Sequence, residues 1–338
     1  MDGAPRPTCT ISTPAPGDSF RTILGTSPRR APVLLAALLT GGVLHAQAPP
    51  ASAALTARLA AIAAPIGYES ALADTLLGLL PGARRDRAGN AVLVRGSGTP
   101  RRLIACQLDE PGWIVGSIRP DGWLTVRRLP GRVPPLFDQQ VEGQQVSLLG
   151  DRGPVPGVVG VRSVHLTRGR TTGEAPFTSD DAYVDVGARS AEEARALGIR
   201  ETTPFVLAKR LHRYGDSLLA APVAGMRAGC AALTAAASAR PARGSVTLAF
   251  VVEQGLSARG LLTAVNTGGP FEEVVLLDTG NDAGVAVRPD STLSNAASAP
   301  VSRWRLGVRH AGTPVETVSL GGVTALERRV AAWIGGGR

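Results

Sequence analysis

Apolar and polar residues repeat along this chain with two different periods, and the order of these periods predicts an α/β fold. Helical spacing of apolar residues predicts helices over 51–64 and 69–80. Two short β-prone runs follow at 91–95 and 102–107, and helical and strand-like segments alternate again over 226–278. Such alternation is typical of a mostly parallel sheet flanked by helices.

The middle of the chain has a different pattern, because residues 115–208 contain many short strand-like runs that Gly and Pro turns separate. This pattern predicts a β-rich, barrel-like domain inserted between the two parts of the α/β domain, residues 49–114 and 209–338. Residues 279–299 are polar and lack a clear period, so we expect a loop there.

The first residues have the features of an export signal. Arg29 and Arg30 precede the apolar run 31–44, and the small-residue sequence Ala46-Gln47-Ala48 follows it. We therefore expect residues 1–48 to be a signal peptide that directs the protein to the periplasm or out of the cell, with no stable membrane span after cleavage. The apolar run is short for a permanent anchor, but an uncleaved anchor stays open as the alternative.

The chain is basic, with 36 Lys and Arg against 27 Asp and Glu and a formal net charge of +9. The basic residues are scattered, and the sequence contains neither a basic stripe with interleaved aromatic residues nor a zinc-finger spacing. We therefore expect no nucleic-acid partner. Adhesion to anionic envelope surfaces remains an alternative role for the excess charge.

Two cysteines remain once the predicted signal, which contains Cys9, is removed. Cys106 lies in a predicted core strand and Cys230 in a predicted core helix. The two residues are either buried free thiols, which behave as small apolar groups, or a disulfide, which requires Cα atoms within about 7 Å of each other. Both alternatives are open at this stage.

Three acidic residues follow predicted strands: Asp109, Glu253 and Asp278. Open α/β sheets bind their ligands beyond the carboxyl ends of the strands, so these carboxylates are candidate site residues. The bland alternative is that each one caps a turn or pairs with an Arg at the end of a strand.

The segments around these residues resemble, in order, those of the glutamyl aminopeptidase family of co-catalytic zinc aminopeptidases, which includes tetrahedral and endoglucanase-M-like members. The resemblance implies an α/β peptidase domain with an inserted dimerisation domain, homo-oligomers, peptide substrates and a divalent metal such as zinc or cobalt. Six segments carry it: LIACQLDEPGWIV (103–115), PVPGVVGVRSVHL (154–166), DAYVDVGARSAEEARALGI (181–199), GMRAGCAAL (225–233), VVEQGLSARG (251–260) and HAGTPVETVSL (310–320).

The resemblance also implies roles for individual residues. Glu253 matches the general base, and Asp109 matches the carboxylate that supports the first metal-binding histidine. Asp278 and His310 match metal ligands. Three further ligand positions are substituted, and these degenerate positions are Gln107, Gly225 and Gln254.

These substitutions weaken the expected chemistry, because zinc is bound by Cys, His or carboxylate ligands and an uncharged amide is a poor one. We expect an exported metallo-aminopeptidase by ancestry whose peptide hydrolysis is impaired or lost. One alternative is a non-catalytic pseudopeptidase that binds a peptide or partner, and another is an active enzyme with a remodelled single-metal site. The predicted loop at 279–299 replaces a strand and helix of the family, which would narrow the sheet and open the substrate pocket.

Overall fold

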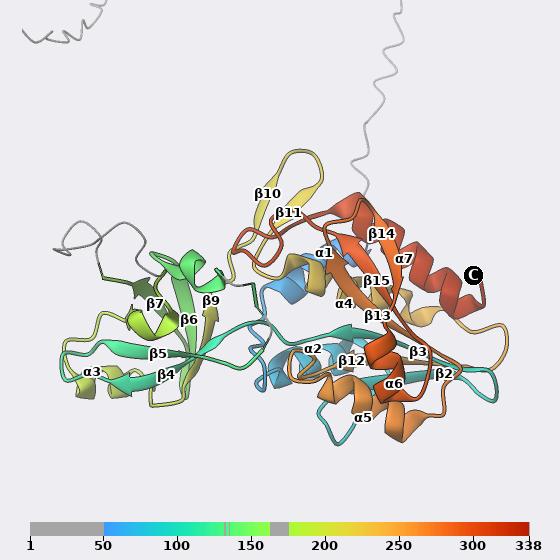
Figure 1. Ribbon diagram of the computed structural model, residues 1–338, viewed down its shortest axis with the longest axis horizontal. Coiled ribbons are helices and arrows are strands. Elements are labelled where there is room, and N and C mark those ends of the chain that lie inside the picture. Colours follow the sequence, from blue (N-terminus) through green and yellow to red (C-terminus); the bar gives the residue numbers. More distant parts are fainter. Residues whose placement is uncertain (1–50, 132, 135, 163–175, 338) are drawn as a thin grey trace, which may run out of the picture. The chain divides into compact units, whose positions relative to one another are not determined.

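The computed structural model describes residues 51–131, 133–134, 136–162 and 176–337 (Figure 1). The predicted signal peptide lies outside these residues. None of the helices in the described ranges is both long and apolar enough to cross a membrane.

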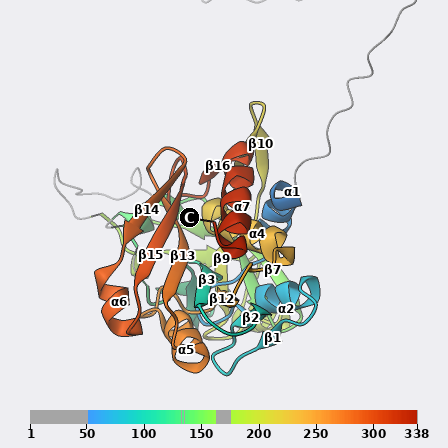
Figure 2. The same cartoon turned by 90° about the vertical axis from the view of Figure 1, so that its right-hand side faces the viewer.

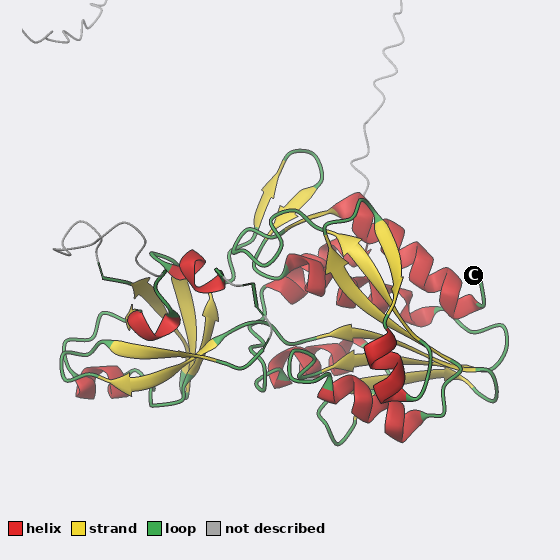
Figure 3. Ribbon diagram, viewed as in Figure 1, coloured by secondary structure: helices red, strands yellow, loops and turns green. Residues whose placement is uncertain are grey.

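A seven-stranded sheet forms the centre of the α/β domain (Figures 1 and 3). From one edge to the other its strands are β1 (Arg84–Arg85), β2 (Ala91–Gly96), β12 (Ser245–Val251), β3 (Arg101–Gln107), β13 (Glu273–Gly280), β15 (Val301–Gly307) and β14 (Val285–Pro289). The four strands β12, β3, β13 and β15 are parallel to one another, whereas β2 and β14 pair antiparallel. Every residue of β12 is buried, as expected for a strand covered on both faces.

Helices cover both faces of this sheet (Figure 2). One core contains residues of α1 (Ala51–Ala60), α2 (Ser70–Leu79), α4 (Ala224–Ala235) and α7 (Leu320–Gly335). The other core contains residues of α5 (Arg259–Gly268) and α6 (Ser291–Ala297). The small Ala and Gly residues of α4 allow it to pack closely, and nine of its twelve residues are buried.

The inserted segment is a closed six-stranded barrel, drawn at the left of Figures 1 and 3. Its strands are, in barrel order, β4 (Trp113–Ile118), β5 (Leu124–Arg128), β8 (Tyr183–Asp185), β7 (Gly153–Gly160), β6 (Gln145–Gly150) and β9 (Pro204–Leu207). Trp113 fills its interior, with the rings of Phe137 and Phe205 each stacked 5.7 Å away. The α/β fold class with an inserted barrel is therefore confirmed.

Smaller elements complete the described chain. The barrel segment also contains α3 (Ala191–Ala196) and two short 3₁₀ segments, η1 (Phe137–Val141) and η2 (Ser179–Asp181). A third, η3 (Ala236–Ser238), follows α4. After the barrel, β10 (His212–Tyr214), β11 (Leu218–Ala220) and β16 (Thr317–Ser319) form a three-stranded antiparallel sheet.

The expected loop at 279–299 is wrong, because this segment contains β14 and α6. The residues of β14 are half-buried or exposed, so this edge strand lacks the buried alternation that marks a strand in a sequence. Helix α6 is short, and it begins at a cap in which Asp290 Oδ1 accepts a hydrogen bond from the backbone N–H of Leu293, at 2.9 Å. The sheet therefore keeps a strand and a helix in the place where we expected it to be narrowed.

The structure also decides between a disulfide and two free thiols for the two remaining cysteines. Cys106 of β3 and Cys230 of α4 form a disulfide, with a Cα–Cα distance of 5.3 Å. Both residues are buried in the larger core. The disulfide therefore joins the central strand of the sheet to the helix that covers it.

Candidate functional site

A cavity of about 710 Å³ lies at the carboxyl end of the parallel strands. Residues from the ends of β3 and β15 line it, together with α5, α6 and the chain that follows β5. Of the residues singled out in the sequence, Gln107, Asp109 and Gln254 lie on its wall. The structure thus brings these three together, as the carboxyl-end rule predicts.

Three neighbouring strands place a row of polar side chains at this end of the sheet. Asp278 of β13 pairs with Arg305 of β15. On its other side, Leu277 pairs with Cys106, so the next residue of β3, Gln107, lies beside Asp278. Residues paired across parallel strands point to the same face, and here it is the face that α5 and α6 cover. From β3 through β13 to β15, the row therefore consists of the amide of Gln107, the carboxylate of Asp278 and the guanidinium of Arg305.

Asp278 is bound by a guanidinium group from the neighbouring strand. Arg303 Nη1 donates to Asp278 Oδ2 at 2.9 Å, and Arg305 Nε lies 4.0 Å from the same oxygen. Arg303 also donates through Nε to Asp290 Oδ2 at 2.6 Å. Burial opposes the charge of Arg303, but hydrogen bonds with Asp290 and Asp278 raise its pKa overall. The charge of Asp278 is therefore balanced within the chain.

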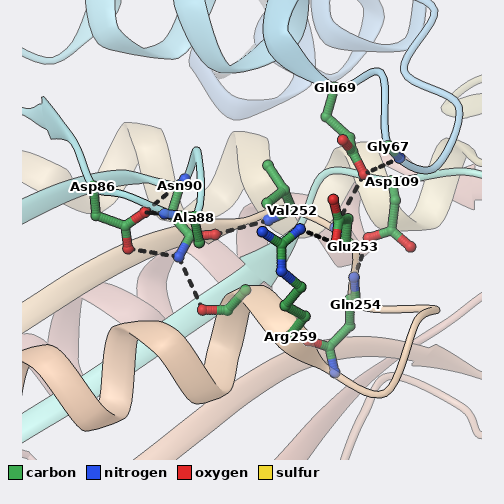
Figure 4. Close-up of polar contacts among 11 residues, drawn as sticks. Gly67, Glu69, Asp86, Ala88, Asn90, Asp109, Val252, Glu253, Gln254 and Arg259 are labelled. Atoms are coloured by element: carbon green, nitrogen blue, oxygen red, sulfur yellow. Dashed lines mark hydrogen bonds and ion pairs between the residues drawn. The ribbon is translucent and has the colours of Figure 1, made fainter.

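The turn after β12 positions Glu253 and Gln254 (Figure 4). Glu253 has a positive φ of 50°, and its N–H donates to Glu69 Oε1 at 3.0 Å. Asp109 accepts the N–H groups of Gln254 and Gly255, at 2.9 and 2.8 Å. Burial raises the pKa of both Glu69 and Asp109. Asp109 therefore serves to hold this turn.

The side chains of the turn have different surroundings. Glu253 contacts the guanidinium of Arg259 at the start of α5 through Oε2 (Figure 4). Gln254 Oε1 is buried and has no hydrogen-bond partner among the described residues. The candidate general base is thus paired with a cation, and the candidate ligand position has an amide oxygen without a donor.

The loop of residues 86–90 also holds the turn after β12 in place. Asn90 accepts the N–H of Val252 at 2.9 Å and donates to the carbonyl of Gly260 at 2.9 Å, while Asp86 accepts from Asn90 Nδ2 at 2.7 Å (Figure 4). The 86–90 turn connects β1 to β2. It also locks the end of β12 to the start of α5.

The space beside Gly225 is filled. A Cβ added there would lie 2.4 Å from Thr279 Cγ2 and 2.6 Å from Val308 Cγ1. Glu316, buried nearby, accepts the N–H of Gly225 at 2.8 Å and that of Gly312 at 2.9 Å. Burial raises the pKa of Glu316. Any side chain at position 225 would therefore meet packed atoms.

His310 is separate from the cavity wall. It is exposed, has a positive φ of 54° and is absent from the lining of the 710 Å³ cavity. Among the described residues, no three His, Cys, Asp or Glu side chains meet in a way that could hold a metal ion. The residues present at Gln107, Gly225 and Gln254, together with an Asp278 already bound to Arg303, do not fit a two-metal centre.

A buried ion cluster supports the wall next to the site. Glu110 contacts Lys209 and accepts from Arg227 Nη2 at 3.2 Å, and Arg227 also donates to the carbonyl of Leu108 at 2.6 Å. Burial lowers the pKa of Lys209, although Glu110 acts in the opposite direction. This cluster ties the end of β3 to α4 and to the chain leaving the barrel.

Sequence reasoning missed two arginines that line the cavity, Arg303 and Arg305. Arg303 and Arg305 occupy alternate positions of the strand VSRWRLG, whose other residues are apolar except for Ser302, on the face that adjoins Asp278. Two cations on the inner face of a predicted strand are unusual and were the available signal. Glu69, Arg259 and Glu316 carried no comparable signal, because their partners are distant in the sequence.

Solved structures with this fold include aminopeptidases and a Thermotoga maritima protein described as an endoglucanase. The chain is similar to the TET1 peptidase of Pyrococcus horikoshii, with a TM-score of 0.74 and 20% identity, covering 84% of this chain and 99% of that one. At this identity the likeness establishes the fold alone.

The family follows from the sequence itself. The model of the M42 glutamyl aminopeptidases matches residues 89–281, more than half of the chain, so the chain belongs to this family. It is 33% identical over 180 residues to the putative aminopeptidase SgcX of Escherichia coli, covering 51% of this chain and 47% of that one. It is 29% identical over 157 residues to the lysyl aminopeptidase of Pyrococcus furiosus, covering 46% and 44%. The matches thus span about half the length of these curated relatives.

Proposed function

We propose that this chain is a non-hydrolytic member of the M42 family that binds peptides in the cavity at the end of the sheet without cleaving them. The Arg303–Asp278 ion pair carries the proposal, because the carboxylate matched to a metal ligand is already neutralised by a guanidinium at 2.9 Å. A metal ion would have to displace this group, and the amides of Gln107 and Gln254 would contribute little to holding it.

The filled space at Gly225 supports the same conclusion. A bridging carboxylate at this position would need room for its Cβ, which Thr279 and Val308 occupy. The candidate base is also engaged, since Glu253 contacts Arg259. A water molecule would have to compete with that guanidinium for the carboxylate.

Metal content and hydrolysis, measured on one sample, test the proposal. The protein is incubated with Zn²⁺ or Co²⁺, desalted and assayed for bound metal and for cleavage of leucine p-nitroanilide. We expect well under one metal ion per chain and no cleavage above the buffer blank. Stoichiometric metal together with cleavage would refute the proposal, provided that both are lost in Asp278→Asn and kept in the half-buried control Asp282→Asn, whose carboxylate pairs with Arg288.

Export and assembly are part of the proposal. The buried Cys106–Cys230 disulfide supports export, because disulfides persist in oxidising compartments and are rare in the cytosol. The Pyrococcus horikoshii TET1 peptidase, which shares the fold, can assemble into a tetrahedron or a large octahedral shell. We propose that this chain forms homo-oligomers through the inserted domain, residues 115–208.

Each part has its own measurement. Fractionation of expressing cells should place a shortened chain outside the cytoplasm, and a full-length chain in the cytoplasm would contradict export. Light scattering should give a mass above that of one chain, and a monomer would contradict assembly.

A further inference from the structure

We infer that the 710 Å³ cavity binds the carboxylate of a short peptide and that Arg305 is the cation that receives it. The inference rests on the proposed function, since it requires a cleft that holds peptide without a metal ion. A volume of this size is within the ordinary range for small-ligand sites, about 300–1,000 Å³.

Arg305 is the least compensated cation on the cavity wall. Its nearest anionic oxygen, Asp278 Oδ2, is 4.0 Å away and already accepts from Arg303 at 2.9 Å. Its Nε is buried without a hydrogen-bond partner among the described residues, yet 40% of the side chain is exposed. A buried donor without an acceptor is unfavourable, and guanidinium groups bind carboxylates through paired hydrogen bonds.

The acidic groups of the wall do not offset this cation. Asp109 accepts two backbone N–H groups, Asp290 accepts from Arg303 and from Leu293, and Glu110 is enclosed by Lys209 and Arg227. A further cation, Arg128, also lines the cavity and reaches its partner Asp138 only at 3.5 Å. The weakly paired charged groups of the wall are therefore cations, Arg305 and Arg128, and they favour an anionic ligand.

A second, smaller cavity indicates the rest of the ligand. It measures about 230 Å³ and shares Glu110, Pro111, Val133 and Met226 with the first. Apolar side chains, including Phe137 and Leu207, line its other side. A ligand lying across Met226 would place a carboxylate near Arg305 and an apolar side chain in the smaller cavity. This pairing describes a short peptide with an apolar residue next to its carboxylate.

Calorimetric titration with matched probes tests the inference. The probes are acetyl-Ala-Leu, whose carboxylate is free, and acetyl-Ala-Leu-amide, which is neutral and otherwise the same. A charge-assisted hydrogen bond predicts that the acid binds about tenfold more tightly, or better, than the amide. Arg305→Gln should abolish the difference. The control Arg288→Gln should keep it, because Arg288 lies on edge strand β14 with 59% of its side chain exposed.

One further probe and one further variant complete the test. Acetyl-Ala-Glu-amide carries its carboxylate on a side chain, and tighter binding of this probe than of acetyl-Ala-Leu would assign the recognised group to an acidic side chain. Arg305→Lys keeps the charge and should retain part of the preference, which guards against misfolding of Arg305→Gln. Equal binding of acid and amide, or a preference unchanged in Arg305→Gln, would overturn the inference. The metal and hydrolysis assay is separate, so equal binding of acid and amide without cleavage would overturn this inference and leave the proposed function standing.

Discussion

Gly225→Ala tests directly whether the position matched to a bridging ligand is closed. The substitution adds a single methyl group, which would lie 2.4 Å from Thr279 Cγ2 and 2.6 Å from Val308 Cγ1. Neither contact involves the free end of a long side chain. The helix or its neighbours must therefore move, as in other cases where a methyl group is forced into a packed core.

The expected size of the effect comes from two opposing contributions. Replacing Gly by Ala inside a helix stabilises by about 0.5–1 kcal/mol, whereas overpacking costs about 1–3 kcal/mol. Gly225 is the second residue of α4, where the gain is smallest, so the net change should be a loss of about 1–2 kcal/mol. Gly229 of the same helix is the matched control. A Cβ there meets nothing closer than Leu277 Cβ at 3.5 Å, so Gly229→Ala should stabilise by about 0.5–1 kcal/mol.

Urea unfolding of the two variants and of the parent gives the free energies directly. Adding Thr279→Ser to Gly225→Ala removes the methyl group of the closest contact and should restore part of the loss, a coupling that a double-mutant cycle measures. If Gly225→Ala were as stable as Gly229→Ala, the position would have room for a side chain, and the argument against a bridging ligand would fail.

The other predictions concern stability. Burial raises the pKa of Glu316 in the folded protein above its ordinary value of 4.5. At a pH between this ordinary value and the raised pKa of the folded protein, the native state therefore binds more protons than the unfolded chain. The free energy of unfolding should therefore fall as the pH rises through that window, and urea titrations should show a smaller fall in Glu316→Gln. Asn90→Ala leaves the buried N–H of Val252 without its acceptor and should cost about 1–3 kcal/mol in the same assay. Replacing Cys106 and Cys230 by Ala should cost about 2–4 kcal/mol relative to the oxidised parent, and reductant should not affect this variant.

Much of the fold was predictable because it depends on local periodicity. The fully buried β12 and the Ala-rich α4 have strong patterns, and the closed barrel has short strands between Gly and Pro turns. The segment 279–299 failed for a physical reason. An edge strand whose residues are all half-buried or exposed, and a helix of seven residues, carry too little apolar pattern to be distinguished from a loop.

The candidate site was predictable only in part. The carboxyl ends of β3 and the turn after β12 bring Gln107, Asp109 and Gln254 onto one cavity wall. What the sequence could not supply was the set of partners, because contacts such as Glu69 with the N–H of Glu253 join residues 184 positions apart. Strand register decides that Arg305 lies beside Asp278, and register is a property of the folded sheet.

The presence of Asp109 and Asp278 at positions that match the family does not by itself indicate catalysis, because each carboxylate has a structural role in this chain. Asp109 holds the Gln254–Gly255 turn through two N–H groups, and Asp278 balances Arg303, which in turn binds the residue that caps α6. Removing Asp109 would leave the N–H groups of Gln254 and Gly255 without their acceptor, and removing Asp278 would leave Arg303 with Asp290 alone as a close carboxylate partner. Both losses are costly whether or not a reaction takes place. Stability alone is therefore enough to retain them, and substitutions that restored the missing ligands would also have to displace Arg303 and reopen the space at Gly225.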